Sequence, residues 1–277
     1  LAEIYRGQGL YSKAEPLYLR ALAIQEKALD SEHLTTAVIL SNLALLHATQ
    51  GQYSRAEPLF LRALAINEKA LGPEHSDTAM TLDYLALLYH DQGIHDKAEP
   101  LYLRALVIRE KAFGSENTVT AISFNNLAGL YENQGLYSKA EPLHLRALSI
   151  REKALGPEHP DTATSLNDLA GLYVNQGLYG KAEPLYLRAL AIREKALRAE
   201  HPTTAISLNN LAGLYSKQDL YDKAEPLYLS ALAINERALG EEHPRTANSL
   251  NNLAGLYDEK GLYSKSEDLT RRALEVE

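Results

Sequence analysis

The 277-residue sequence contains no cysteine, no tryptophan and a single methionine. Without cysteine there is no disulfide framework and no thiolate chemistry. No apolar run approaches the ~18 residues that a membrane-spanning helix needs. The net charge of −8 and the pI of about 5.6 come without a basic stripe, which argues against nucleic-acid binding. We therefore expect no nucleic-acid or membrane partner and a cytoplasmic location.

What the sequence has in abundance is self-similarity. Residues 157–198 align with residues 199–240, and 30 of the 42 positions are identical. A fixed period of this size is typical of a solenoid. We expect one array over residues 1–277, with a truncated first repeat (1–30), five full units (31–240) and a last repeat with a polar end (241–277). The period is marked by Tyr11, Tyr53, His95, Tyr137, Tyr179, Tyr221 and Tyr263.

Each repeat carries two amphipathic helical patterns, which we name helix A and helix B. In the repeat from residue 157, helix A has apolar residues at the spacing i, i+3, i+4 and i+7, namely Leu166, Leu169, Ala170 and Tyr173. Helix B follows with Ala182, Leu185, Tyr186, Ala189, Leu190 and Ile192. Neither helix can bury its apolar face alone, so we expect neighbouring repeats to stack on one another.

Local signals predict where the helices begin and end. Helix A is expected to begin near Pro160 and to end at a left-handed residue, Gly177. Helix B is expected to begin with a Ser-x-x-Glu capping box or an Asp in the same place, and Pro184 to lie in its first turn. The first helix B is predicted over residues 12–29. The predicted caps are Ser12, Ser54, Asp96, Ser138 and Asp222.

These residues resemble the tetratricopeptide repeat, whose consensus has a period of about 34 residues rather than 42. The resemblance rests on Leu169, Ala170, Tyr173, Gly177, Tyr179, Ala182, Tyr186 and Ala189. The longer form, with LNNLAGLY and RALAIREKALGPEHP, is similar to the repeats of kinesin light chains and of many bacterial proteins, and it covers all 277 residues. The resemblance implies an all-α, right-handed superhelical solenoid of helix-turn-helix repeats.

Most recurring polar residues have a structural interpretation. A histidine precedes helix A in five repeats, and Asn117 takes the place in a sixth: His33, His75, His159, His201 and His243. A metal site needs several ligands within ~2 Å of one ion, whereas each of these belongs to a different repeat. We interpret them as capping or packing residues, and we expect no metal, no cofactor and no enzymatic activity. The tyrosines are interpreted as packing residues, and the run Arg193-Glu194-Lys195 as a solvated outer face.

The asparagines opposite the apolar face of helix A are less easily explained, because asparagine is a poor helix former. The resemblance implies that helix A lines a concave groove, in which an asparagine row holds a peptide backbone through paired donors and acceptors. Alternatively, neighbouring asparagines bond one another along the superhelix, and both interpretations stay open. Gly129, Gly171 and Gly213 would leave room for a ligand. The candidate residues are Asn42, Asn125, Asn126, Asn133, Asn167, Asp168, Asn175, Asn209, Asn210, Asn251 and Asn252.

The charges of this face predict the kind of ligand. Tetratricopeptide domains that clamp a carboxylate use Lys and Arg beside Asn. The corresponding face of helix A has almost no basic residue here, and Lys217 is the exception. Acidic residues are present instead: Glu132, Asp168, Asp258 and Glu259. A neutral or basic peptide therefore fits better. Apolar pockets are expected at Val38, Met80, Tyr84, Ile122 and Ile206.

The two ends of the array differ from its middle. Leu1 aligns with Leu169, so the chain is expected to start inside a repeat and to associate end to end through the incompletely covered first helix B. In the last helix B, Thr270, Arg271 and Glu275 replace apolar residues, which reads as a partial cap or as ordinary drift. We expect a protein-interaction scaffold for an extended peptide, and the alternative is an assembly or regulatory module of a larger protein without a peptide ligand.

Overall fold

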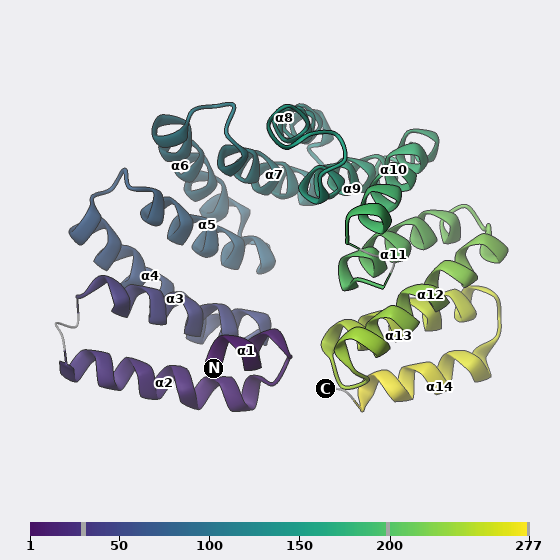
Figure 1. Cartoon of the computed structure of the whole chain (residues 1–277), viewed down its shortest axis with the longest axis horizontal. Coiled ribbons are helices and arrows are strands. Elements are labelled where there is room, and N and C mark those ends of the chain that lie inside the picture. Colours follow the sequence, from purple (N-terminus) through teal and green to yellow (C-terminus); the bar gives the residue numbers. More distant parts are fainter. Residues whose placement is uncertain (29–31, 198–199, 276–277) are drawn as a thin grey trace. The chain divides into compact units, whose positions relative to one another are not determined.

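The computed structural model describes residues 1–28, 32–197 and 200–275, and within these residues the chain forms fourteen α-helices and no strand (Figure 1). The predicted all-α fold is confirmed. The helices are α1 (Ala2–Gly7), α2 (Tyr11–Ala28), α3 (Leu34–Thr49), α4 (Tyr53–Leu71), α5 (Ser76–Asp91), α6 (His95–Phe113), α7 (Thr118–Asn133), α8 (Tyr137–Leu155), α9 (Pro160–Asn175), α10 (Tyr179–Leu197), α11 (Pro202–Ser216), α12 (Tyr221–Leu239), α13 (Pro244–Glu259) and α14 (Tyr263–Leu274).

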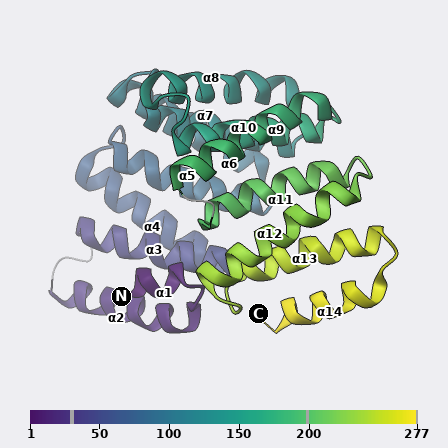
Figure 2. The ribbon, with the colours of Figure 1, turned by 45° about the vertical axis from the view of Figure 1, so that its right-hand side comes forward.

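The chain divides into two compact units, Leu1–Ile150 and Arg151–Glu277, and the boundary falls within α8. Odd-numbered helices are helices A and even-numbered helices are helices B. Helices A pack beside their own helices B, as α3 does with α4 and α13 with α14 (Figure 2). The grouping of residues 1–277 into a single array stays a prediction.

Successive helices A also contact one another within each unit. In the first unit α5 contacts α3 and α7, and in the second unit α11 contacts α9 and α13. Small and branched residues fill the space between the helices, as Ala205, Leu208 and Ala231 do between α11 and α12. The helices A of a unit therefore form a closely spaced row, and the residues on the face away from this core are the ones that a ligand of the row would meet.

Each loop histidine is the N-cap of helix A, which confirms the capping interpretation. In His201 the Nδ1 atom accepts a hydrogen bond of 3.2 Å from the backbone N–H of Thr203. Asn117 does the same through Oδ1, with a distance of 2.9 Å to the Val119 nitrogen. The side chain satisfies one of the amide groups that lack an intrahelical partner at the start of a helix.

The turn between helix A and helix B is closed by a left-handed glycine, as predicted. Gly177 has φ of 72°, and the amide of the next residue, Leu178, donates to the Tyr173 oxygen at 2.8 Å. This is the bond pattern of a Schellman C-cap. One turn departs from the rule, because Asp219 occupies the glycine position with φ of 59°.

The predicted start of helix B is wrong. The helices begin one residue earlier, at the tyrosine or at His95, and the preceding residue is the N-cap: Gln52, Ile94, Leu220 and Leu262 make no capping side-chain bond. The reason is the tight turn that precedes helix B. The backbone oxygen of its last residue already accepts the first hydrogen bonds of the helix, as the Leu220 oxygen does from the Lys223 amide at 3.0 Å. Ser12, Ser54, Ser138, Asp96 and Asp222 therefore lie inside the helix rather than capping it.

The proline of helix B consequently lies in the second turn of the helix rather than in the first. Pro184 is the sixth residue of α10, so its missing N–H removes one bond of the helical ladder. Pro184 is exposed, and water can reach the affected stretch of backbone. The predicted end of the first helix B and two predicted repeat boundaries fall on residues that lie outside the described part of the chain: Leu29, Asp30, Ser31, Arg198 and Ala199. No helix in the described part of the chain is long and apolar enough to cross a membrane.

Candidate functional site

Three polar side chains meet where one repeat joins the next, and we call such a set a junction triad. Each triad combines the first residue of the Asn-Asn pair on one helix A, a residue of the following helix B and a hydroxyl on the next helix A. In the triad of Asn167, Arg193 and Ser207, the Asn167 Nδ2 and Arg193 Nη1 atoms donate to Ser207 Oγ at 3.0 and 2.9 Å. The triad therefore ties α9, α10 and α11 together.

The position of Arg193 contradicts the predicted solvated face. Its side chain is 5% exposed and also donates to the Thr203 oxygen at 3.0 Å and to Thr164 Oγ1 at 3.2 Å. Burial lowers the pKa of Arg193, and the nearby Asp168 carboxylate opposes that shift. These bonds compensate for the lost hydration of the guanidinium. Glu194 and Lys195, its neighbours in the predicted run, are exposed, and Lys195 donates to Glu158 at 2.6 Å.

The triads of the first unit differ in charge. Asn67 Nδ2 donates to Thr81 Oγ1 at 2.9 Å, which is a neutral contact. One period later Arg109 donates to Ser123 Oγ at 2.6 Å and forms a buried ion pair with Asp83. Burial raises the pKa of Asp83 to about 6, although the Arg109 charge and the bond from Asn126 work in the opposite direction.

The triad of Asn209, Asn235 and Ser249 is neutral and incompletely bonded. Asn235 Nδ2 donates to Ser249 Oγ at 2.9 Å and to the Arg245 oxygen at 3.3 Å, and Asn209 Nδ2 donates to Ser249 Oγ at 3.3 Å. The Oδ1 atoms of Asn209 and Asn235 are enclosed and have no hydrogen-bond partner. Such acceptors lower the free energy of unfolding, because each has lost its hydrogen bond to water and forms no hydrogen bond within the protein.

A pocket of about 280 Å³ opens beside this triad, on the row of helices A in the second unit. Its lining comes from α11, α12 and α13 and is rich in side-chain amides. The lining residues are Ile206, Asn209, Asn210, Asn235, Arg245, Asn248 and Asn252.

The predicted site residues separate into two groups. The first residue of each pair is mostly a triad member: Asn167 is buried, and Asn125 and Asn209 are half-buried. Asn125 faces His144 Nδ1 at 3.2 Å rather than a ligand. Asn251 is exposed. The asparagines therefore bond to serines of the next repeat or to a histidine in these contacts, not to one another.

The second residue of each pair is more accessible. Asn42, Asn126, Asp168 and Asn210 are partly exposed and Asn252 is exposed. Asn210 and Asn252 lie together in the amide-rich pocket, whereas Asn133 and Asn175 are exposed at the ends of α7 and α9. A Cβ added to Gly171 would meet Tyr186 Oη at 3.7 Å, which is an ordinary contact, so this position has room for a small side chain.

Comparison with known proteins identifies the repeat. The family model described as tetratricopeptide repeat matches residues 1–69, 37–111, 77–153, 119–195, 167–233 and 203–276. The chain is a tetratricopeptide repeat protein. No curated protein matches the chain.

Solved tetratricopeptide-like structures resemble it over most of its length. BtubC (BKLC) from P. vanneervenii is 24% identical with a TM-score of 0.61, covering 82% of this chain and 88% of that one. A Podosopora anserina protein described as a kinesin light chain with nearly identical TPR-like repeats is 28% identical with a TM-score of 0.57, covering 73% and 96%. A Rap protein complexed with competence and sporulation factor is 18% identical with a TM-score of 0.70, covering 99% and 72%.

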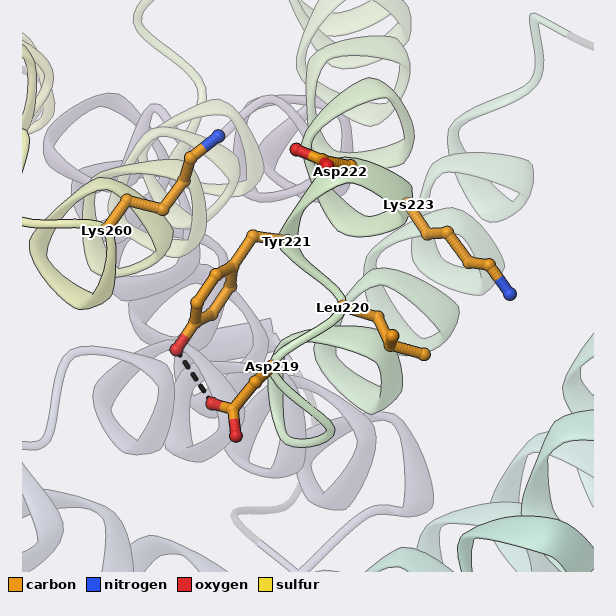
Figure 3. Close-up of a pocket in the computed structure, with 6 residues that line it drawn as sticks. All are labelled: Asp219, Leu220, Tyr221, Asp222, Lys223 and Lys260. Carbon is orange, nitrogen blue, oxygen red and sulfur yellow. Dashed lines mark hydrogen bonds between the residues drawn. The ribbon is translucent and has the colours of Figure 1, made fainter.

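The tetratricopeptide repeat protein has a second recess of about 330 Å³ at the turn between α11 and α12 (Figure 3). The Tyr221 hydroxyl donates to Asp219 Oδ1 at 2.8 Å, and Lys260 is paired with Glu225 at 2.5 Å. Lys223 and Lys260 lie on opposite sides of Tyr221 in Figure 3, so their charges do not converge on one point. In the portion of the chain that the structure describes, no group of three His, Cys, Asp or Glu residues is placed to hold a metal ion.

Sequence reasoning missed three residues of the amide-rich pocket of this tetratricopeptide repeat protein: Asn235, Arg245 and Asn248. A signal for Asn235 exists in the repeat alignment. The same helix-B position holds arginine in the three preceding repeats, at Arg109, Arg151 and Arg193, and changes to asparagine only here and at Asn67 among the full repeats. This break in the internal series singles out Asn235 among the later repeats.

Proposed function

We propose that this tetratricopeptide repeat protein is an interaction scaffold that binds an extended peptide segment of another protein along its helices A. The observation that carries the proposal is the pocket in which Asn210, Asn248 and Asn252 lie together on the ligand-accessible face. Each amide group can donate to a peptide oxygen and accept from a peptide N–H at the same time. Asparagines on successive helices A present a donor and an acceptor at regular intervals, which suits the regularly spaced peptide groups of an extended backbone.

Two further observations support a peptide of neutral or basic character. The chain carries a net charge of −8, and Asp258 and Glu259 are exposed beyond the pocket on α13. In the first unit, Val38, Met80 and Ile122 are exposed on α3, α5 and α7, where they offer apolar contacts to side chains of a ligand. A further structure that resembles this chain, a Rap conjugation gene regulator, is in complex with the Phr* peptide, so the fold accommodates a peptide there.

An array of immobilised, extended 12-residue peptides tests the proposal. We expect the full chain to bind a subset of these peptides, and Asn210→Ala to weaken that binding at least fivefold while the protein stays folded. Gly171→Leu should likewise block a ligand that crosses α9. The control is Glu194→Ala, on the exposed side of α10, which should bind as the parent does. An array without any bound peptide, or equal binding by Asn210→Ala and the parent, would refute the proposal.

A second candidate function is assembly through the helices B. In the first unit, one leucine of each helix B is 41–46% exposed: Leu19, Leu61, Leu103 and Leu145. Repeated apolar residues on the exposed side of these helices suit contact with a large partner rather than with a peptide. Leu103→Lys combined with Leu145→Lys should then abolish capture of the partner while binding on the peptide array is unchanged.

A further inference from the structure

We propose that the amide-rich pocket of the second unit takes a carboxamide side chain, that of a glutamine or an asparagine in the bound peptide. The inference rests on the proposed peptide-binding function and assigns a specificity to one place within it. Its starting point is the difference between two junction triads that are one period apart: Asn167, Arg193 and Ser207 on one side, and Asn209, Asn235 and Ser249 on the other.

The pocket lies where an arginine is replaced by a shorter residue. Arg193 makes three contacts, to Ser207 Oγ, to the Thr203 oxygen and, with its far end, to Thr164 Oγ1. Asn235 reproduces the first two, to Ser249 Oγ and to the Arg245 oxygen. It is too short to reproduce the third. The counterpart of Thr164 is Ile206, and Ile206 and Asn235 line the pocket together.

The shorter residue also leaves one additional hydrogen-bond acceptor without a donor. Asn235 is 3% exposed, and its Nδ2 group donates to Ser249 and to the Arg245 backbone oxygen. Because a backbone oxygen can only accept, the amide of Asn235 cannot be turned around, and its unpartnered atom is Oδ1. Asn209 Oδ1 is unpartnered as well, as is its counterpart Asn167 Oδ1 beside Arg193, so the triad with Asn235 has two open acceptors where the other has one.

A ligand can reach one of these acceptors, Asn209 Oδ1, through a small movement of the Asn209 side chain. The residue is half-buried, it lines the pocket, and its bond to Ser249 is long at 3.3 Å. The terminal torsion of an asparagine side chain is soft, so rotation about it brings Oδ1 into the pocket at low cost. A ligand donor at that point supplies a hydrogen bond that the protein alone does not make.

The chemistry of the lining selects among ligand groups. A carboxylate brings only acceptors and leaves the two amide oxygens unsatisfied. An ammonium or guanidinium brings donors, but it meets Arg245, the one charged residue among the described residues that line the pocket. An apolar side chain makes none of these bonds. A carboxamide carries two N–H donors and an oxygen that accepts from the surrounding asparagines, so it matches the lining in both number and charge.

The test uses capped single amino acids on the full chain, followed by ¹H–¹⁵N NMR. The probes are N-acetyl-glutamine N-methylamide and the equally capped glutamate, lysine and leucine. We expect capped glutamine to shift the signals of α11 and α13 with a dissociation constant at least tenfold below those of the other three. Tighter binding of capped glutamate, lysine or leucine, or no binding of capped glutamine, would overturn the proposal.

Two variants locate the effect. Asn235→Arg combined with Ile206→Thr supplies the guanidinium and the hydroxyl acceptor of the Arg193 triad, and should abolish the glutamine preference while the thermal midpoint stays near that of the parent. If this double variant does not fold, Asn248→Ala at an exposed lining position replaces it, with an expected loss of at least fivefold. Unchanged binding in the variant used contradicts the assignment. If the array captures peptides but the capped amino acids show no preference for glutamine, only this inference is refuted. If the array captures no peptide, the proposed scaffold function is refuted.

Discussion

Arg193 Nη1 donates a 2.9 Å hydrogen bond to Ser207 Oγ, which joins helix B of one repeat to helix A of the next. Both residues are buried, so the interface between repeats is not purely apolar. The bond has a direction and a required partner, and it therefore favours one way of stacking the two helices over others that would bury the same apolar area. A guanidinium in this place is stabilised only while its acceptors are present.

The stability of the array is expected to depend on Arg193. Arg193→Met removes a donor from Ser207, from the Thr203 oxygen and from Thr164, and should lower the free energy of unfolding by about 2–4 kcal/mol. Arg193→Asn should keep two of these three contacts, as Asn235 does, and should lower the free energy of unfolding by less than half as much. Urea denaturation measures both. As a control, Arg188→Ala removes an exposed ion pair with Glu152 and should cost less than about 1 kcal/mol; equal costs at the two positions would contradict the role of the triad.

Asp83 is expected to make stability depend on pH. Burial raises its pKa to about 6, above the ordinary 3.8, so the folded protein binds a proton in a range where the unfolded chain does not. The free energy of unfolding should therefore rise as the pH falls from about 6 to about 4, by up to roughly 3 kcal/mol from this group. At neutral pH Asp83 is mostly ionised, and the free energy of unfolding is then lower than it is with the carboxyl protonated.

Asp83→Asn supplies the comparison, because asparagine fills this position in the later repeats. The other carboxylates are common to both proteins, so the difference between the two unfolding curves isolates Asp83. We expect the difference in stability to change between pH 4 and pH 6 and to be constant above pH 7. A difference that does not vary with pH would show that the Arg109 ion pair holds the carboxylate ionised throughout.

The turn at Asp219 is expected to be improved by glycine. Its φ of 59° is in the left-handed region, where the other turns of this type carry glycine, as Gly177 does at 72°. Asp219→Gly should raise stability by about 0.5–1 kcal/mol, since a Cβ is unfavourable there and the lost bond from Tyr221 is exposed. Thermal unfolding measures the gain. The reciprocal change, Gly177→Asp, should lower the midpoint, and a gain from both changes would contradict the explanation.

The histidine cap is expected to be replaceable by asparagine but not by alanine. His201→Ala leaves the Thr203 amide without its acceptor and should cost about 1 kcal/mol. His201→Asn should cost little, because Asn117 caps α7 through the same backbone position. Helix content and thermal midpoint at neutral pH report the effect. Equal destabilisation by both substitutions would mean that the imidazole acts through packing instead.

The features that sequence reasoning predicted are those determined within one repeat. The period, the two helices, the cap at His201 and the left-handed Gly177 depend on residues close together in the chain, and each is confirmed. The start of helix B was wrong because the signal of Ser-x-x-Glu competes with a tight turn that already satisfies the same amides. A sequence pattern alone does not determine whether the helix begins with the capping box or with the tight turn.

Burial of Arg193 could not be predicted from the helix itself. Its neighbours Glu194 and Lys195 are exposed, and its own bonds lead to Thr164 and Ser207 on two different helices A. The pocket beside Asn235 depends on the same three-helix geometry. The candidate asparagines were found on the helix by periodicity, but only the arrangement of neighbouring repeats separates Asn167, a structural residue, from Asn210, which faces the pocket.

The junction triads join one repeat to the next, as Asn167 to Ser207, whereas the ion pair of Lys195 with Glu158 lies within the repeat of residues 157–198. A gene that loses or duplicates one 42-residue segment therefore encodes a protein in which every new boundary meets a partner of the same kind. Such a chain can become longer or shorter by whole repeats without needing a new type of interface between neighbouring repeats. Substitutions at lining positions such as Asn235, Asn248 and Asn252 do not alter this period, so that array length and the lining of a pocket can change separately.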